Sequence, residues 1–258
     1  MRAPVVISYG GGTNSTAMLI GLVERQEPVD LVLFADTGGE RPGTYAYVKL
    51  FSQWLVERGY PEIQTVWYVN RKGERVTLEQ RSLETERLPS LAYGFKKCSM
   101  RYKRDPQNKF VNNWQPAKDC WARGEKVIKY LGFDADEPQR ARDMDDSKYR
   151  YLYPLVEWNW GREECVETIE AAGLPQPGKS SCFFCPAMKS HEILQLKSCH
   201  PELLERALAI ERAAAPHCRG SIKGLGRDWK WESLTKADDM QMKMFLTGPS
   251  INCGCYDG

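Results

Sequence analysis

The 258-residue sequence lacks the features that would place a protein in a membrane or outside the cell. No apolar run approaches the ~20 residues needed to span a bilayer. The N-terminus offers a single arginine and then Val5-Val6-Ile7, an apolar run too short for the core of a signal peptide. We therefore expect a cytoplasmic protein with no membrane partner.

The sequence also lacks an excess of either charge. Its 36 Lys and Arg residues oppose 34 Asp and Glu residues, which leaves a net charge of +2. This balance argues against a protein that coats nucleic acid through bulk charge, although it leaves room for a local basic groove. The length suits one large α/β domain, or one such domain with a small appendage.

Disulfide bonds are not expected, although the chain has nine cysteines. The count is odd and no secretion signal accompanies it, which argues against a disulfide framework. Cysteines this abundant in a reducing compartment suggest metal or redox work for some of them. Others, such as Cys165 on a helical pattern, are expected to be small buried apolar residues.

Alternating strand and helix patterns predict an α/β fold with a parallel sheet and flanking helices. The predicted strands cover residues 5–9, 31–35, 63–69 and 127–133, and the predicted helices cover 16–23, 42–58, 162–172 and 202–214. Ligands of such sheets bind at the carboxyl ends of the strands. From residue 217 onward we find little periodicity.

The loop after the first predicted strand has three consecutive glycines, followed by polar residues at the start of a helix. Backbone N–H groups of such a loop point at an anion, and the helix N-terminus adds about half a positive charge. Three glycines exceed what a helix cap needs, which favours a phosphate cradle over a plain tight turn. The residues predicted to contact the nucleotide are Ser8, Gly10, Gly11, Gly12, Thr13, Asn14 and Ser15.

Two further loops lie at the same predicted edge of the sheet. Asp36 ends the second strand and could bind Mg²⁺ or a ribose or adenine edge, with Thr37 and Gly38 beside it; the alternative is a simple helix cap. After the fourth strand, Arg140 and Arg142 could clamp a phosphate or sulfate, unless they belong to a solvated loop of mixed charge.

The cysteines offer a candidate metal centre and a candidate nucleophile. Cys182 and Cys185 form a Cys-x-x-Cys whose thiolates, together with Cys98, could bind zinc or an iron–sulfur cluster, form a redox pair, or pack as apolar residues. Cys253 lies near the C-terminus, where a thiolate could act as a nucleophile or belong to an end without function.

Two of these motifs resemble one superfamily. The glycine loop resembles the PP-loop of ATP pyrophosphatases, usually Ser-Gly-Gly-Lys-Asp-Ser: Gly11, Gly12 and Ser15 match, whereas Thr13 replaces Lys and Asn14 replaces Asp. The Asp-Thr-Gly that begins at Asp36, with a following Pro and Thr-Tyr, resembles the same region of the phosphoadenosine phosphosulfate (PAPS) reductase family. Two matched motifs at the right separation are more specific than one.

The resemblance implies an adenine nucleotide alpha hydrolase-like, Rossmann-like fold. The nucleotide-binding domain would cover residues 1–160, and a C-terminal helical, cysteine-containing region (161–258) would complete the site. The implied ligands are ATP, or PAPS or adenosine phosphosulfate, with Mg²⁺ near Asp36. The resemblance leaves the oligomeric state open, with a homodimer as one possibility.

The resemblance also gives the cysteines a role. Related iron–sulfur enzymes imply a 4Fe-4S cluster on Cys98, Cys182 and Cys185, with Cys199 as a candidate fourth ligand. The leading hypothesis is ATP-dependent sulfur transfer that forms AMP and pyrophosphate, with tRNA or DNA among the candidate acceptors. The alternatives are reduction of a sulfonucleotide by Cys253, whose surroundings resemble the Glu-Cys-Gly tail of such reductases, and a nucleotide-binding regulatory protein with structural zinc.

Overall fold

A five-stranded parallel sheet forms the centre of the fold, which confirms the predicted α/β class. The computed structural model describes residues 2–141 and 144–247, with side chains described as far as residue 240. The strands stand in the order β3-β2-β1-β4-β5 and all their pairings are parallel. Their bounds are β1 Val5–Tyr9, β2 Leu31–Asp36, β3 Ile63–Trp67, β4 Val127–Leu131 and β5 Tyr149–Leu152.

Strand β1 is the central strand and is fully buried at Val6 and Ile7. Ile7 pairs with Val32 of β2 on one side and with Tyr130 of β4 on the other. The chain moves outward from β1 to β3 and then returns to the opposite side of β1, so the strand order reverses between β1 and β4. Such a switch point opens a crevice at the carboxyl ends of the two strands, and the glycine loop follows β1 there.

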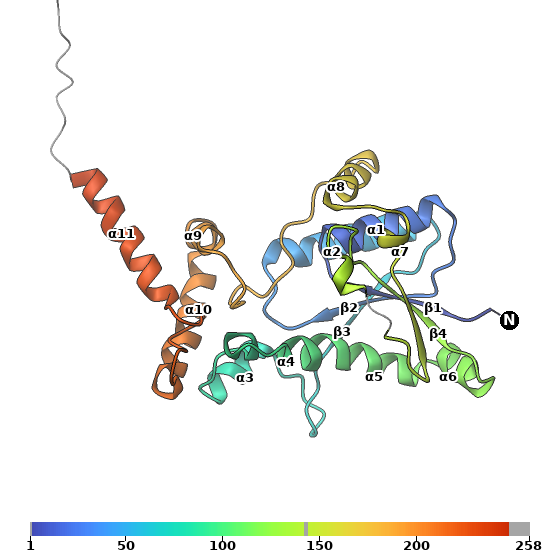
Figure 1. Cartoon of the computed structure of the whole chain (residues 1–258), viewed down its shortest axis with the longest axis horizontal. Helices are drawn as coiled ribbons and strands as arrows, with labels where there is room; N and C mark the ends of the chain where they lie inside the picture. Colours follow the sequence, from blue (N-terminus) through green and yellow to red (C-terminus); the bar gives the residue numbers. More distant parts are fainter. Residues whose placement is uncertain (1, 142–143, 248–258) are drawn as a thin grey trace, which may run out of the picture. The chain divides into compact units, whose positions relative to one another are not determined.

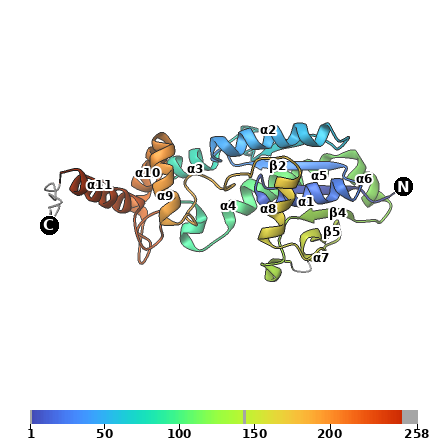
Figure 2. The same cartoon turned by 90° about the horizontal axis from the view of Figure 1, so that it is seen from above.

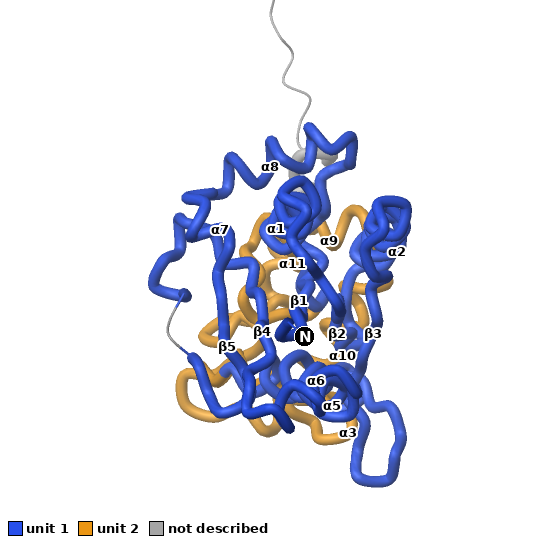
Figure 3. Tube along the Cα trace, turned by 90° about the vertical axis from the view of Figure 1, so that its right-hand side faces the viewer, with its two compact units in different colours: residues 1–81, 96–183 blue, residues 82–95, 184–258 orange. Residues whose placement is uncertain are grey.

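Helices cover both faces of the sheet (Figure 3). Helices α1 (Thr13–Glu24), α2 (Pro42–Val56) and α8 (Arg162–Ala171) lie on one face, whereas α5 (Asp105–Asn113) and α6 (Gln115–Ala122) lie on the other. Helix α1 is buried on nearly all sides because α8 packs on its outer surface (Figures 1 and 2). This arrangement explains why the sequence of α1 is apolar without a clear polar face.

The chain divides into two compact units, residues 1–81 with 96–183 and residues 82–95 with 184–258. The first unit contains the whole sheet, and the predicted boundary at residue 160 falls inside it because α8 packs on α1. The observed boundary instead separates Phe183 from Phe184, within the Cys-x-x-Cys.

The remaining helices are α3 (Leu78–Glu84), α4 (Lys97–Ser99), α7 (Pro154–Glu157), α9 (Ser190–Cys199), α10 (Pro201–Ala214) and α11 (Trp231–Thr247), with short turns η1 (Ser90–Tyr93), η2 (Met100–Arg104), η3 (Pro138–Arg140) and η4 (Ala215–His217).

The second unit is organised around the buried carboxylate of Glu211 on α10. It accepts hydrogen bonds from the backbone N–H groups of Leu225, Trp231 and Glu232, at 2.8, 2.9 and 3.0 Å. Two of these donors belong to the first turn of α11, where a carboxylate satisfies groups that the helix itself leaves unbonded. The sequence shows little periodicity after residue 217 although α11 lies there, because a tertiary contact rather than a local pattern fixes the start of this helix.

Lys129 is an unusual residue of the sheet, since it lies in the middle of β4 with only 3% of its surface exposed. Its Nζ donates to Asn108 Oδ1 at 3.1 Å and lies 5.3 Å from the centre of the Tyr149 ring. Burial, reinforced by the charge of Arg104, lowers the pKa of Lys129 from 10.5 to about 8. The charged form is therefore destabilised in the folded state.

We predict that Lys129→Met stabilises the protein at pH 7 by up to about 3 kcal/mol, because the buried charge costs free energy wherever it stays protonated. The unfolded state binds more protons than the folded state between about pH 8 and 10.5. The wild-type free energy of unfolding should therefore rise across that window relative to the variant. Urea unfolding at pH 7 and pH 10 measures both, and a variant less stable at pH 7 would contradict the prediction.

Candidate functional site

The glycine loop leads from β1 directly into α1, and its conformation requires glycine. Gly11 has a φ of +71°, and Gly12 is the N-cap of α1 without any side-chain capping hydrogen bond. A Cβ atom at Gly12 would lie 2.7 Å from Ser180 Oγ. The first turn of α1 therefore keeps backbone N–H groups that no intrahelical acceptor can satisfy, which is the arrangement that binds anions.

The hydroxyl groups of α1 hold the shape of this loop. Ser15 Oγ accepts from Gly10 N at 3.2 Å and donates to the Gly12 carbonyl at 3.1 Å. Thr16 Oγ1 donates to the same carbonyl at 3.0 Å and lies 3.1 Å from the Tyr9 hydroxyl. Both hydrogen bonds of the Ser15 hydroxyl are made to backbone atoms of the loop. An anion bound here would therefore be contacted mainly by backbone N–H groups.

The loop after β4 closes over the first turn of α1. A Cβ atom at Gly132 would lie 2.9 Å from Ser15 Cα, so glycine is needed for the close approach. Asp134, which is 6% exposed, accepts from Asn14 Nδ2 at 2.5 Å through one oxygen, while its other oxygen is buried without a hydrogen-bond partner. Arg162 Nη1 donates to Asn14 Oδ1 at 3.2 Å.

The carboxylate of Asp36, at the end of β2, is bonded to three donors. Its Oδ1 accepts from Gly38 N and from the Tyr45 hydroxyl, both at 2.7 Å, and its Oδ2 accepts from Arg75 at 2.6 Å. Burial and the hydrogen bond to Asp36 raise the pKa of Tyr45, which remains the donor. Asp36 therefore fixes the loop that contains Thr37 and Gly38.

The segment that contains Cys182 lies against this β2 loop. Phe183 N donates to the Gly39 carbonyl at 2.8 Å, and Cys182 Sγ lies 3.1 Å from Thr37 Oγ1. Two residues earlier, Ser180 lies over Gly12. The first unit thus brings Cys182 to the edge of the sheet that also presents the glycine loop.

The other cysteines divide into buried and more accessible residues. Cys120 and Cys165 are fully buried, which confirms the expected packing role of Cys165, and burial raises its pKa to about 12. Cys98 and Cys185 are partly exposed and Cys199 is exposed. Over residues 2–141 and 144–240, no three Cys, His, Asp or Glu side chains gather at a point that could hold a metal ion.

Two predicted nucleotide-binding residues have other surroundings, and two further predicted site residues lie outside the described parts of the chain. Ser8 Oγ donates to Gln107 Oε1 at 2.6 Å, toward α5. Arg140 is exposed, pairs with Glu137, and lies over the Phe133 ring at 4.3 Å. Arg142 and Cys253 lie outside the described residues.

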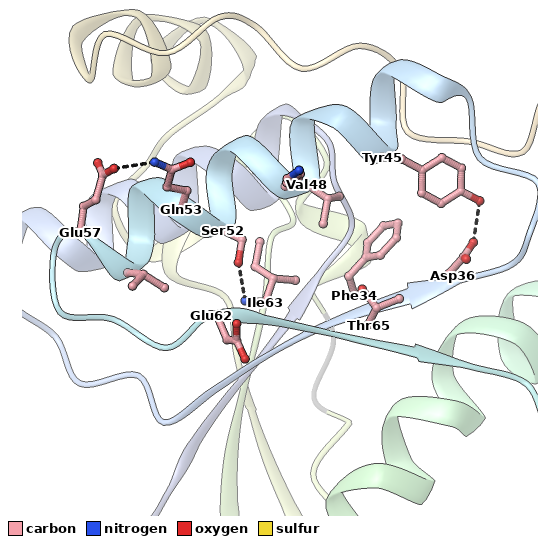
Figure 4. A pocket seen from close by; sticks show the side chains of 12 residues that line it. Phe34, Asp36, Tyr45, Val48, Ser52, Gln53, Glu57, Glu62, Ile63 and Thr65 are labelled. Atoms are coloured by element: carbon pink, nitrogen blue, oxygen red, sulfur yellow. Dashed lines mark hydrogen bonds between the residues drawn. The ribbon is translucent and has the colours of Figure 1, made fainter.

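A cleft of about 610 Å³ lies between α2 and strands β2 and β3 (Figure 4). Phe34, Val48 and Ile63 form part of its lining, and the hydrogen-bonded pair of Asp36 and Tyr45 lies at one end. A Cβ atom at Gly11 would lie 3.4 Å from Phe34 and 3.5 Å from Val48. Phe34 and Val48 therefore lie beside both the cleft and the glycine loop.

The sequence analysis did not predict four residues that contact the site: Gly132, Arg162, Ser180 and Arg75. Gly132 falls inside the predicted strand 127–133, whereas β4 ends at Leu131, so the prediction did not place Gly132 in the loop. Arg162 gives no local signal, because 148 residues separate it from its partner Asn14.

Comparison with known proteins adds little to this geometry. No protein-family model and no curated protein sequence matches the chain. Among solved structures, the chain is similar to the U34-tRNA thiolase NcsA from Methanococcus maripaludis with its 4Fe-4S cluster, at a TM-score of 0.46 and 15% identity. The match covers 86% of this chain and 75% of the thiolase chain. A likeness of this degree supports no inference about activity.

We predict that Gly11→Ala destabilises the protein by about 1–2 kcal/mol, because an alanine is strained at a positive φ. Its Cβ would also lie 3.2 Å from Thr44 Cγ2. Gly43→Ala is the matched control: Gly43 lies in α2 with nothing within 4 Å of an added Cβ. The control should be neutral or stabilising by up to about 1 kcal/mol. Equal thermal shifts in the two variants would contradict the requirement for glycine at position 11.

Proposed function

We propose that this protein is an enzyme that binds an adenine nucleotide on residues 10–12 and uses it for ATP-dependent sulfur transfer. The nucleotide assignment is supported by the position of the loop at the switch point between β1 and β4 and by the uncapped N-terminus of α1. The resemblance of this loop to the PP-loop adds the expectation that pyrophosphate is the leaving group.

One observation carries the sulfur part of the proposal. The segment 180–183 touches the glycine loop through Ser180 and the β2 loop through Phe183, with Cys182 Sγ beside Thr37. A cysteine is thereby held next to the place where the nucleotide phosphates would lie. A thiol in that position could orient a sulfide ion for attack on an acceptor that the nucleotide has just activated.

The proposed reaction has two steps. An oxygen of the acceptor attacks the α-phosphorus of ATP, and the α–β phosphoanhydride bond breaks to release pyrophosphate. A hydrosulfide ion then forms a carbon–sulfur bond with the activated acceptor carbon, and the carbon–oxygen bond breaks so that AMP leaves with the oxygen. The backbone N–H groups at the start of α1 would stabilise the charge that develops on the phosphates.

The metal requirements stay open to experiment. Mg²⁺ at Asp36 would require the carboxylate to exchange its bond with Arg75 for the cation. The described cysteines do not fit a preformed cluster site, so no step is derived through a cluster. The 4Fe-4S cluster predicted on Cys98, Cys182, Cys185 and Cys199 remains a prediction, as do tRNA or DNA as acceptors.

We predict that anaerobically purified protein converts ATP to AMP and pyrophosphate when sulfide and an acceptor pool of tRNA or DNA are supplied. Cys182→Ala should reduce the yield of thiolated acceptor at least tenfold, because it removes the thiol held beside Thr37. Cys218→Ala is the matched control, since the Cys218 thiol donates to the Ala214 carbonyl in the second unit.

Iron, acid-labile sulfide and zinc should be counted on the same preparation. About four irons with matching sulfide, lost in Cys182→Ala, would support the predicted cluster. One zinc per chain, no iron and no pyrophosphate would overturn sulfur transfer and leave a nucleotide-binding protein with structural zinc.

A further inference from the structure

A chain of polar contacts connects the inside of the sheet edge to a charged group at the surface. The buried carboxylate of Asp134 accepts from Asn14 Nδ2, and Asn14 Oδ1 accepts from the exposed guanidinium of Arg162. Asn14 is the second residue of α1, and Arg162 is the first residue of α8. The contacts therefore place a cation beside the first turn of α1.

The orientation of the Asn14 amide is fixed by its neighbours. A carboxylate can only accept hydrogen bonds, so the NH₂ group must face Asp134 and the carbonyl oxygen must face away from it. A flipped amide would set its oxygen against the carboxylate. Asp134 thus determines which side of Asn14 offers an acceptor to Arg162.

Hydrogen bonds fix the backbone of Arg162 as well as its side chain. Its N–H donates to Asp136 Oδ2 at 2.7 Å, and Gly161 N donates to Glu164 Oε2 at 2.8 Å, which together cap α8. Helix α8 also packs along α1. The base of the Arg162 side chain is therefore fixed relative to the glycine loop.

Arg162 differs from three other basic residues near the loops. Arg75 pairs with Asp36, Lys103 pairs with Glu40 and Arg140 pairs with Glu137. In the described parts of the chain, the Arg162 side chain forms no ion pair with a carboxylate. A guanidinium has five N–H donors, so the bond to Asn14 leaves capacity for two oxygens of a phosphate.

We propose that Arg162 binds the nucleotide phosphates, with Asn14 and Asp134 as its positioning residues. This inference rests on the proposed nucleotide site, and it assigns to α8 the positive charge that is absent at Thr13. The ligand class is a nucleoside polyphosphate, whose oxygens match the planar fork of a guanidinium.

The test is a calorimetric titration of the full-length protein with α,β-methylene ATP and, separately, with adenosine. We expect Arg162→Gln to weaken binding of the ATP analogue roughly 10- to 100-fold while binding of adenosine stays unchanged. Arg162→Lys should recover part of the loss, since it restores the charge without the fork. Thermal melting should show that these surface variants stay folded.

Arg58→Gln is the matched control, because it removes the same charge at the far end of α2, where Arg58 stacks on Trp54. Wild-type affinity in Arg162→Gln would overturn the role of Arg162 while leaving the nucleotide site intact. Failure of the wild-type protein to bind the analogue would instead overturn the proposed function itself. The two failures are therefore distinguishable.

A double-mutant cycle tests the positioning role. Asn14→Ala should weaken analogue binding less than Arg162→Gln does, roughly 3- to 10-fold, because the guanidinium is present but no longer held. The double variant should bind no more weakly than Arg162→Gln alone. Additive losses would show that Asn14 acts independently and would overturn the relay.

Discussion

The carboxyl edge of the sheet depends on the absence of side chains at two positions. Ser180 packs directly on Gly12, and the backbone of Ser15 packs directly on Gly132. A Cβ atom at either glycine would clash with these neighbours. Through these two contacts, the segment before Cys182 and the loop after β4 both reach the start of α1. The strand order also brings these loops together, because β1 lies between β2 and β4.

Charge balance is the second constraint on this edge. Asp36, Glu40 and Asp134 are all buried there, so each needs a partner and each would repel a phosphate. At an effective dielectric constant of about 20, two unit charges 4 Å apart repel by about 4 kcal/mol. Arg75 and Lys103 balance the first two carboxylates, whereas Asp134 has only the neutral amide of Asn14. An unpaired cation nearby is therefore what an anion site at this edge requires.

The sequence predicted the elements whose patterns are local. Apolar runs identified β1, β2 and β4, and alternation identified β3. Helical periods identified α1, α2, α8 and α10 within a few residues at each end. The short strand β5 and helices α3 to α6 escaped prediction, because none of them is longer than nine residues. Helix α11 was missed for a different reason, since Glu211 on another helix defines where it starts.

The same distinction separates what was and was not foreseen at the candidate site. The glycine loop and Asp36 could be found from sequence because each directly follows a strand. The bond partners of Asp36 could not, and neither could the contact between Asn14 and Arg162, since both depend on how separate loops meet. Nothing local in the sequence indicates that Ser15 Oγ bonds within its own loop.

Thr13 and Asn14, the two positions at which the loop differs from the PP-loop pattern it resembles, fit the charges around them. A carboxylate at position 14 would face Asp134 where Asn14 now donates at 2.5 Å, and two negative groups at that distance would be strongly destabilising. An amide satisfies Asp134 with its nitrogen and Arg162 with its oxygen, which no carboxylate could do. Thr13 is buried, so a lysine at that position would bury a charge. Under the proposed role of Arg162, the positive charge beside the loop would come from α8.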